Sequence, residues 1–131
     1  MEKVLVTGAT GFIGKALVQT LVAQQFNVVA GVRQIDESQS DAQIELGDLC
    51  AATDFSAVLQ DIDVVIHLAA RAHIMHNRAS DPLAAFRKVN TAGTLNLAIQ
   101  AAEAGVKRFI FISSIKVNGE LTTSNASFQV E

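Results

Sequence analysis

The chain has 131 residues, half of them hydrophobic, and a formal net charge of −3. That charge gives no electrostatic basis for binding nucleic acid or an anionic membrane, and no apolar run is long enough to cross a bilayer. The single cysteine, Cys50, excludes an internal disulfide and fits a reducing compartment. No basic and apolar leader precedes the first predicted strand, so we expect one cytoplasmic domain over residues 1–131.

Short apolar runs alternate with amphipathic stretches along the chain. The apolar runs predict strands at Val4–Thr7, Asn27–Val32, Gln43–Leu46, Asp63–Leu68 and Lys107–Ser114. The amphipathic stretches predict helices over Gly11–Gln24, Thr53–Gln60 and Pro82–Ala104. The spacing in the first helix places on its inner face Phe12, Ala16, Leu17, Leu21 and Val22. This alternation predicts an α/β fold with a doubly wound parallel sheet, followed by a loose tail at about 120–131.

Three glycines, spaced G-x-x-G-x-x-G, separate the first predicted strand from the first helix. Gly8 permits a tight exit from the strand, Gly11 lets the backbone approach a pyrophosphate, and Gly14 lets the helix pack closely. The free N–H groups at the start of the helix then face the anion. The spacing predicts a dinucleotide phosphate cradle made by Gly8, Thr10, Gly11, Phe12, Ile13 and Gly14. A glycine-rich turn without a ligand is the alternative.

Two other phosphate-binding motifs do not fit this segment. A Walker A loop needs G-x-x-x-x-G-K-[ST], but Ala9 stands at its first glycine and Ala16 at its Ser or Thr. The G-x-G-x-x-G fingerprint fails because two residues separate Gly8 from Gly11. The run Thr7–Gly14 instead resembles the short-chain dehydrogenase/reductase superfamily, in the form typical of its extended branch of NAD(P)-dependent nucleotide-sugar epimerases and dehydratases.

The resemblance covers nearly all of the chain and implies an NAD(P)-binding Rossmann fold, truncated before the sixth strand and the substrate lobe. Cofactor choice depends on the residues after the second strand. Enzymes that use NAD place an acidic side chain there for the ribose 2′-hydroxyl, whereas this chain has Val32 and Arg33. A guanidinium would attract a 2′-phosphate, so we expect NADP to be favoured over NAD. The alternatives are a solvated Arg33, with Asp36 or Glu37 bending back to the ribose.

The resemblance implies further contacts with the cofactor. Gly47-Asp48-Leu49 looks like the superfamily segment whose Asp accepts a hydrogen bond from the adenine amino group, although Asp48 could simply cap a turn. The run His67–Ala70 resembles His-x-Ala-Ala, whose small residues let the backbone pass close to the cofactor. The implied cofactor contacts are therefore Asp48, Leu49, Leu68, Ala69 and Ala70. We expect His67 itself to be a satisfied core histidine rather than a catalytic one.

No metal site is expected, because His67, His73 and His76 have no Cys or carboxylate at ligand spacing. The segment Asn90–Thr94 resembles Asn-x-x-Gly-Thr, in which the Asn supports the active-site helix and holds a water; an interior amide bonded to backbone is the alternative. The segment Ser113–Gly119 resembles Ser-Ser-x-x-Val-Tyr-Gly. This likeness places the catalytic hydroxyl on Ser114, where it would hydrogen-bond the reacting sugar oxygen.

The chain contains no tyrosine, so the Tyr-x-x-x-Lys centre of the superfamily is absent, and we expect no turnover from these residues alone. The resemblance implies that they are the cofactor-binding portion of a homo-oligomeric enzyme acting on a nucleoside-diphosphate sugar by transient hydride transfer to nicotinamide. A one-way NADP-dependent carbonyl reductase of the same superfamily and a non-catalytic dinucleotide-binding or sensing module remain as alternatives.

Overall fold

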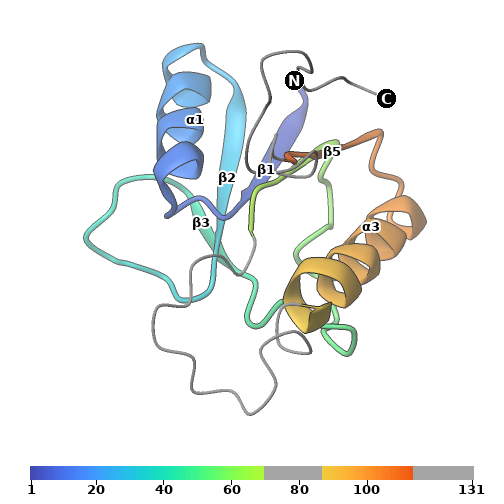
Figure 1. Ribbon diagram of the computed structural model, residues 1–131. Coiled ribbons are helices and arrows are strands. Elements are labelled where there is room, and N and C mark those ends of the chain that lie inside the picture. Colours follow the sequence, from blue (N-terminus) through green and yellow to red (C-terminus); the bar gives the residue numbers. More distant parts are fainter. Residues whose placement is uncertain (70–86, 114–131) are drawn as a thin grey trace, which may run out of the picture.

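The computed structural model of the chain describes residues 1–69 and 87–113. Within these ranges the strands are β1 (Lys3–Thr7), β2 (Asn27–Val32), β3 (Gln43–Glu45), β4 (Val64–His67) and β5 (Arg108–Phe111). They form one parallel sheet in the order β3-β2-β1-β4-β5 (Figure 1). This order is that of a doubly wound Rossmann sheet, and it confirms the predicted fold class.

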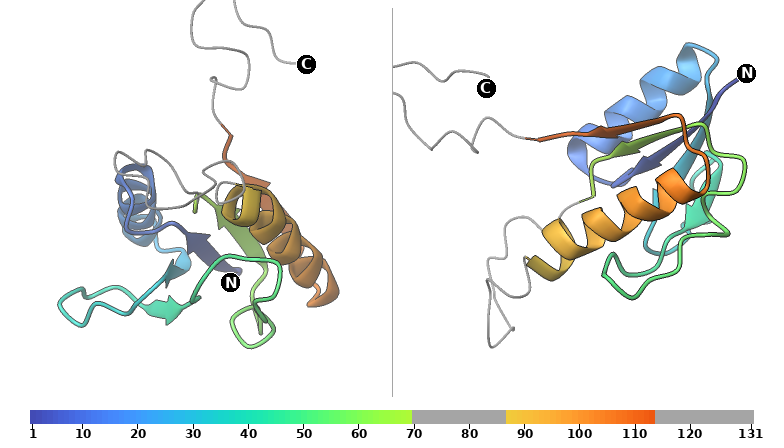
Figure 2. Two further views of the ribbon diagram at one scale, coloured as in Figure 1. Left: turned by 60° about the horizontal axis from the view of Figure 1, so that its bottom comes forward. Right: turned by 90° about the vertical axis from the view of Figure 1, so that its right-hand side faces the viewer.

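Helices cover both faces of the sheet. Helix α1 (Phe12–Ala23) lies on one face, and α3 (Thr94–Glu103) lies on the other (Figure 2). A π-helical segment, η1 (Arg87–Gly93), leads directly into α3. The helix predicted over Pro82–Ala104 is therefore confirmed over residues 87–103, although its first part is π-helical rather than α-helical, while residues 82–86 lie outside the described part of the chain. No described helix has the length and apolar character needed to cross a membrane.

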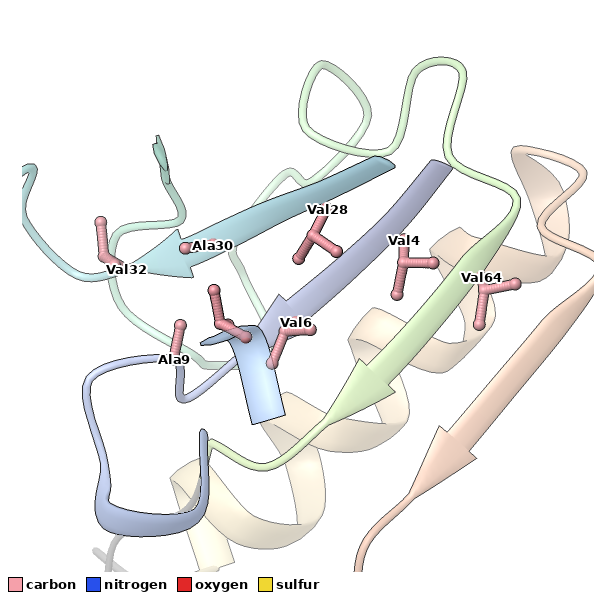
Figure 3. Packing of buried hydrophobic residues seen from close by; sticks show 8 residues of the cluster. Val4, Val6, Ala9, Val28, Ala30, Val32 and Val64 are labelled. Atoms are coloured by element: carbon pink, nitrogen blue, oxygen red, sulfur yellow. The ribbon is translucent and has the colours of Figure 1, made fainter. Parts of the chain in front are cut away.

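Successive residues of β1 face opposite cores, as a strand covered on both faces requires. Val4 and Val6 pack with Val18 on the α1 side, whereas Leu5 packs with Leu97 on the α3 side. Figure 3 shows the first core, with its side chains gathered on one face of β1, β2 and β4.

The buried face of α1 differs from the predicted one. Gly14 and Val18 are buried, and Leu17 and Leu21 are half-buried, at the i, i+3, i+4, i+7 spacing of one helix face. Phe12, by contrast, is 96% exposed, and Ala16 and Val22 are also exposed. The contact of Gly14 with the end of β1 sets the rotation of the helix. This rotation turns the side chain of Phe12, two residues earlier, away from the sheet.

The helix predicted over Thr53–Gln60 is wrong, because this segment forms turns. Leu59 N–H donates to the Phe55 carbonyl (3.0 Å), but the helical pattern does not continue. Side-chain amides of α3 form hydrogen bonds with backbone groups of this segment and of Cys50 before it. Asn96 Nδ2 donates to the carbonyls of Cys50 (2.9 Å) and Thr53 (2.8 Å).

Gln100 completes this amide clamp, by which we mean the hydrogen bonds from Asn96 and Gln100 to the segment from Cys50 to Phe55. Its Oε1 accepts from Phe55 N–H (2.7 Å), and its Nε2 donates to the Thr53 carbonyl (2.8 Å). The clamp lets Phe55 and Leu59 bury completely without a helix to carry them. Tertiary hydrogen bonds have here replaced the local ones that helical periodicity predicts.

Candidate functional site

The glycine loop lies at the carboxyl end of β1, where the chain passes into α1. Gly8 has a φ of +68°, and a Cβ there would lie 2.6 Å from the Ala69 nitrogen. A Cβ on Gly14 would lie 2.0 Å from the Gly8 carbonyl oxygen. The fold itself therefore requires both glycines, the first for its left-handed turn and the last for close helix packing.

Gly11 is less tightly packed than Gly8 and Gly14. It is exposed, and among the described residues a Cβ there would meet the Gly8 carbonyl oxygen at 3.3 Å, a close contact that a shift of a few tenths of an ångström would relieve. Gly11 is also the N-cap of α1 and makes no side-chain cap, so the N–H groups of the first helical turn receive no side-chain oxygen from it. Thr10, Phe12 and Ile13 are exposed beside it. This geometry presents backbone donors at a positive helix end, which is suited to an anion.

A cavity of about 240 Å³ adjoins this loop. Ala9, Thr10 and Lys15 line it from the loop and α1. The other side is formed by Val32 at the end of β2 and by the polar residues that follow, Asp36, Gln39, Asp41 and Gln43. Hydrogen bonds from Ser38 hold the pKa of Asp36 below its usual range, so this carboxylate is ionised.

The residues after β2 and β3 meet across the edge of the sheet. Arg33 Nη2 lies 3.1 Å from Asp48 Oδ1, and the two side chains are 84% and 79% exposed. Val32, by contrast, is buried in the core on the α1 side. Two residues predicted to bind opposite parts of the adenosine are thus neighbours. An exposed ion pair of this kind contributes about 0–1 kcal/mol, so a ligand can displace it at little cost.

Leu49 and Asp48 are held by contacts from outside β3. The Asp48 carbonyl accepts from Thr53 Oγ1 (2.5 Å). A Cβ on Gly93, at the end of η1, would lie 2.7 Å from the Leu49 carbonyl oxygen, so only glycine fits there. The amide clamp and Gly93 together join the segment after β3 to η1 and α3.

A buried chain of hydrogen bonds lies at the carboxyl ends of β1 and β4. Thr7 Oγ1 is 2.6 Å from His67 Nδ1, and His67 Nε2 is 2.8 Å from Thr94 Oγ1. The N–H groups of Leu68 (3.1 Å) and Ala69 (3.2 Å) donate to Thr7 Oγ1. Burial lowers the pKa of His67 to about 4, so the imidazole is neutral. The expectation of a satisfied core histidine is confirmed.

Sequence reasoning did not assign roles to Thr7 and Thr94, although both stand in the quoted motifs, Thr7 before Gly8 and Thr94 after Gly93. Asn90 is half-buried in η1. Ala70 and Ser114 lie outside the described residues, as do His73 and His76. In the ranges 1–69 and 87–113, no group of three or more His, Cys, Asp or Glu side chains is arranged to hold a metal ion.

A parallel sheet in this order, with a glycine loop leading into a helix N-terminus at its switch point, defines a dinucleotide-binding Rossmann domain. The comparison with protein families narrows this class. The chain belongs to the NAD dependent epimerase/dehydratase family, whose model matches residues 4–130.

Individual relatives agree with this family. The chain is 48% identical over 131 residues to a UDP-glucose 4-epimerase of Vibrio cholerae, covering 99% of this chain and 40% of that protein. It is 33% identical over 121 residues to an N-acetyl-alpha-D-glucosaminyl-diphospho-ditrans,octacis-undecaprenol 4-epimerase of Escherichia coli O157:H7, covering 90% and 34%. The chain thus spans well under half the length of these two relatives.

Solved structures show the same fold around a dinucleotide. MoeE5 in complex with UDP-glucose and NAD superposes with a TM-score of 0.75 at 34% identity, over 91% of this chain and 38% of that one. A short-chain dehydrogenase/reductase superfamily protein from Agrobacterium tumefaciens, with bound NAD, gives a TM-score of 0.75 at 29% identity, over 90% and 34%.

Proposed function

We propose that this chain is the nicotinamide-dinucleotide-binding part of a nucleoside-diphosphate-sugar epimerase or dehydratase. The observation that carries the proposal is Gly11, the exposed N-cap residue of α1, where a Cβ would be much less crowded (3.3 Å) than at Gly8 or Gly14. A ligand that approaches the backbone closely accounts for a glycine at this exposed helix end. The substrate class rests on relatives whose names specify UDP-glucose or a related diphospho-sugar.

In this proposal, residues along the carboxyl edge of the sheet contact different parts of the dinucleotide. Backbone N–H groups of the loop Gly8–Gly14 bind the pyrophosphate, and Asp48 accepts from the adenine amino group. The backbone of Leu68–Ala70 passes beside the ribose. A bound nicotinamide would supply hydride transfer. Ser114 would hydrogen-bond the sugar oxygen, and Asn90 would support the active-site helix and hold a water.

Replacing Gly11 tests the proposal. Gly11→Val places a branched side chain where the pyrophosphate would approach, and it should abolish NAD binding measured by calorimetry. Ala16→Val is the matched control, because Ala16 is exposed on α1 one turn beyond the loop. Circular dichroism should show both variants folded. A folded native chain that binds neither NAD nor NADP would refute the proposal.

We further propose that NADP binds more tightly than NAD. Support comes from the end of β2, where Val32 is buried and offers no acceptor for a ribose hydroxyl, while the guanidinium of Arg33 is exposed. One charge-assisted contact with a 2′-phosphate is worth on the order of 1–2 kcal/mol, or roughly tenfold in affinity.

The ratio of the two dissociation constants measures this preference. Arg33→Ala should remove most of it and should reduce its dependence on salt. Asp48→Asn, which releases Arg33 from its ion pair, should weaken both cofactors but increase the ratio in favour of NADP. Equal affinities of the native chain for NAD and NADP would count against the preference.

A further inference from the structure

The hydrogen-bond chain Thr7–His67–Thr94 joins three elements that are far apart in the sequence. Thr7 ends β1, His67 ends β4 and Thr94 begins α3. Thr7 and His67 are fully buried. Two rings of β5 flank the imidazole, with centroids 5.9 Å away at Phe109 and 6.0 Å away at Phe111. The dinucleotide contacts proposed above do not use these hydroxyl and imidazole groups.

The direction of each hydrogen bond follows from counting donors and acceptors. Thr7 Oγ1 accepts from the N–H groups of Leu68 and Ala69, which occupies both lone pairs of the hydroxyl oxygen. The Leu68 N–H is shared with the Thr7 carbonyl oxygen (3.2 Å). The hydrogen of the Thr7 hydroxyl must therefore go to His67 Nδ1. Nδ1 is then an acceptor without a proton, and the imidazole carries its proton on Nε2, which donates to Thr94 Oγ1.

This hydrogen-bond chain holds the backbone just after β4, beside the glycine loop at the switch point of the sheet. Thr7 holds the Leu68 and Ala69 N–H groups, so these residues stay against Gly8, where a Cβ would lie 2.6 Å from the Ala69 nitrogen. At its other end the hydrogen-bond chain reaches Thr94, the first residue of α3, which directly follows the segment η1 that carries Asn90. The spacing between the glycine loop, the β4 end and α3 therefore depends on one oriented set of hydrogen bonds.

We propose that Thr7, His67 and Thr94 are positioning residues for dinucleotide binding, and that the Nε2–H tautomer of His67 locks the β1 and β4 ends to α3. The inference rests on the proposed function, since it concerns the same dinucleotide-binding edge of the sheet. None of the three side chains needs to touch the dinucleotide. They act through the backbone of Leu68 and Ala69, whose position they determine.

Isosteric variants test this role. Thr7→Val keeps the shape but removes the hydroxyl, and it should weaken NAD binding by roughly tenfold, whereas Thr7→Ser should bind within about twofold of the native chain. Thr94→Val and Thr94→Ser repeat the comparison at the other end of the hydrogen-bond chain, in case Thr7→Val does not fold. Val65→Ala, in the core on the α3 side of β4, controls for loss of stability and should leave NAD affinity unchanged.

Nitrogen-15 NMR of the imidazole gives a readout independent of binding, and it should show a proton on Nε2 of His67 and none on Nδ1. The opposite tautomer would overturn the inference. A native chain that binds NAD with folded Val variants that bind equally well would overturn it while leaving the proposed function intact. A Ser variant as weak as its Val counterpart would overturn it too. A folded native chain that binds neither NAD nor NADP would overturn both proposals.

Discussion

The two faces of the sheet are built in different ways. On the α1 face, the core comes mostly from β1, α1 and β2, which follow one another within residues 3–32. On the α3 face, Leu5, Phe55 and Leu97 meet from distant parts of the chain, and the amide clamp organises the segment between them. The first face depends on local backbone geometry, and the second depends on side-chain hydrogen bonds between remote residues.

The largest expected loss of stability concerns the α1 face of the sheet. Gly14→Ala would place a Cβ 2.0 Å from a backbone oxygen that cannot move without displacing β1. We expect the free energy of unfolding, measured in urea, to fall by about 3 kcal/mol or more. Gly11→Ala is the matched control, with a Cβ at 3.3 Å, and should cost about 1 kcal/mol or less. Similar losses at both glycines would contradict the distinction between Gly14, where packing excludes a Cβ, and Gly11, where a small shift accommodates one.

The pH dependence of the free energy of unfolding tests the buried hydrogen bonds of His67. Burial lowers the pKa of His67 to about 4, below the value of about 6.5 for an unfolded histidine. Below pH 6.5 the unfolded state gains a proton that the folded state does not bind. Stability therefore declines as the pH falls from about 6.5 to 4, by about 3 kcal/mol in total.

The variant His67→Gln provides the comparison, because it should lack this slope. Protonation of carboxylates changes the free energy of unfolding in a lower pH range. A hydrogen bond from the Lys3 N–H and the nearby charge of Lys107 hold the pKa of Asp63 below its usual value, so its contribution is lost only below about pH 4. An unchanged slope between pH 6.5 and 4 in the variant would show that His67 is not its source.

The smallest of these effects concerns the clamp on the α3 face. Asn96→Leu removes the donor to the Cys50 and Thr53 carbonyls and the acceptor for Gln100 Nε2, and should cost about 2 kcal/mol of stability in thermal unfolding. The same change on the other face, Gln19→Leu at an exposed position of α1, should stay within about 0.5 kcal/mol. Equal losses would mean that the clamp contributes nothing specific.

The sequence by itself determined the sheet, the glycine loop and the start of α1. Alternating apolar runs and the spacing of Gly8, Gly11 and Gly14 are constraints within a few residues of backbone, and they act before any distant contact forms. The hydrophobic pattern alone predicted the wrong inner face for α1. The rotation of the helix is set by the contact between Gly14 and Gly8 rather than by average hydrophobicity.

Only the tertiary structure decided the turns around Thr53, the ion pair of Arg33 with Asp48, and the hydrogen-bond partners of His67. Each depends on partners that strand order brings together, such as Thr7 and His67, 60 residues apart in the sequence. Periodicity cannot reveal which side-chain amide will satisfy a given carbonyl, since that choice is made by the packing of α3 against the sheet. The sequence therefore indicates where a dinucleotide could bind, and the packed sheet and α3 determine how the backbone after β4 is held beside the glycine loop.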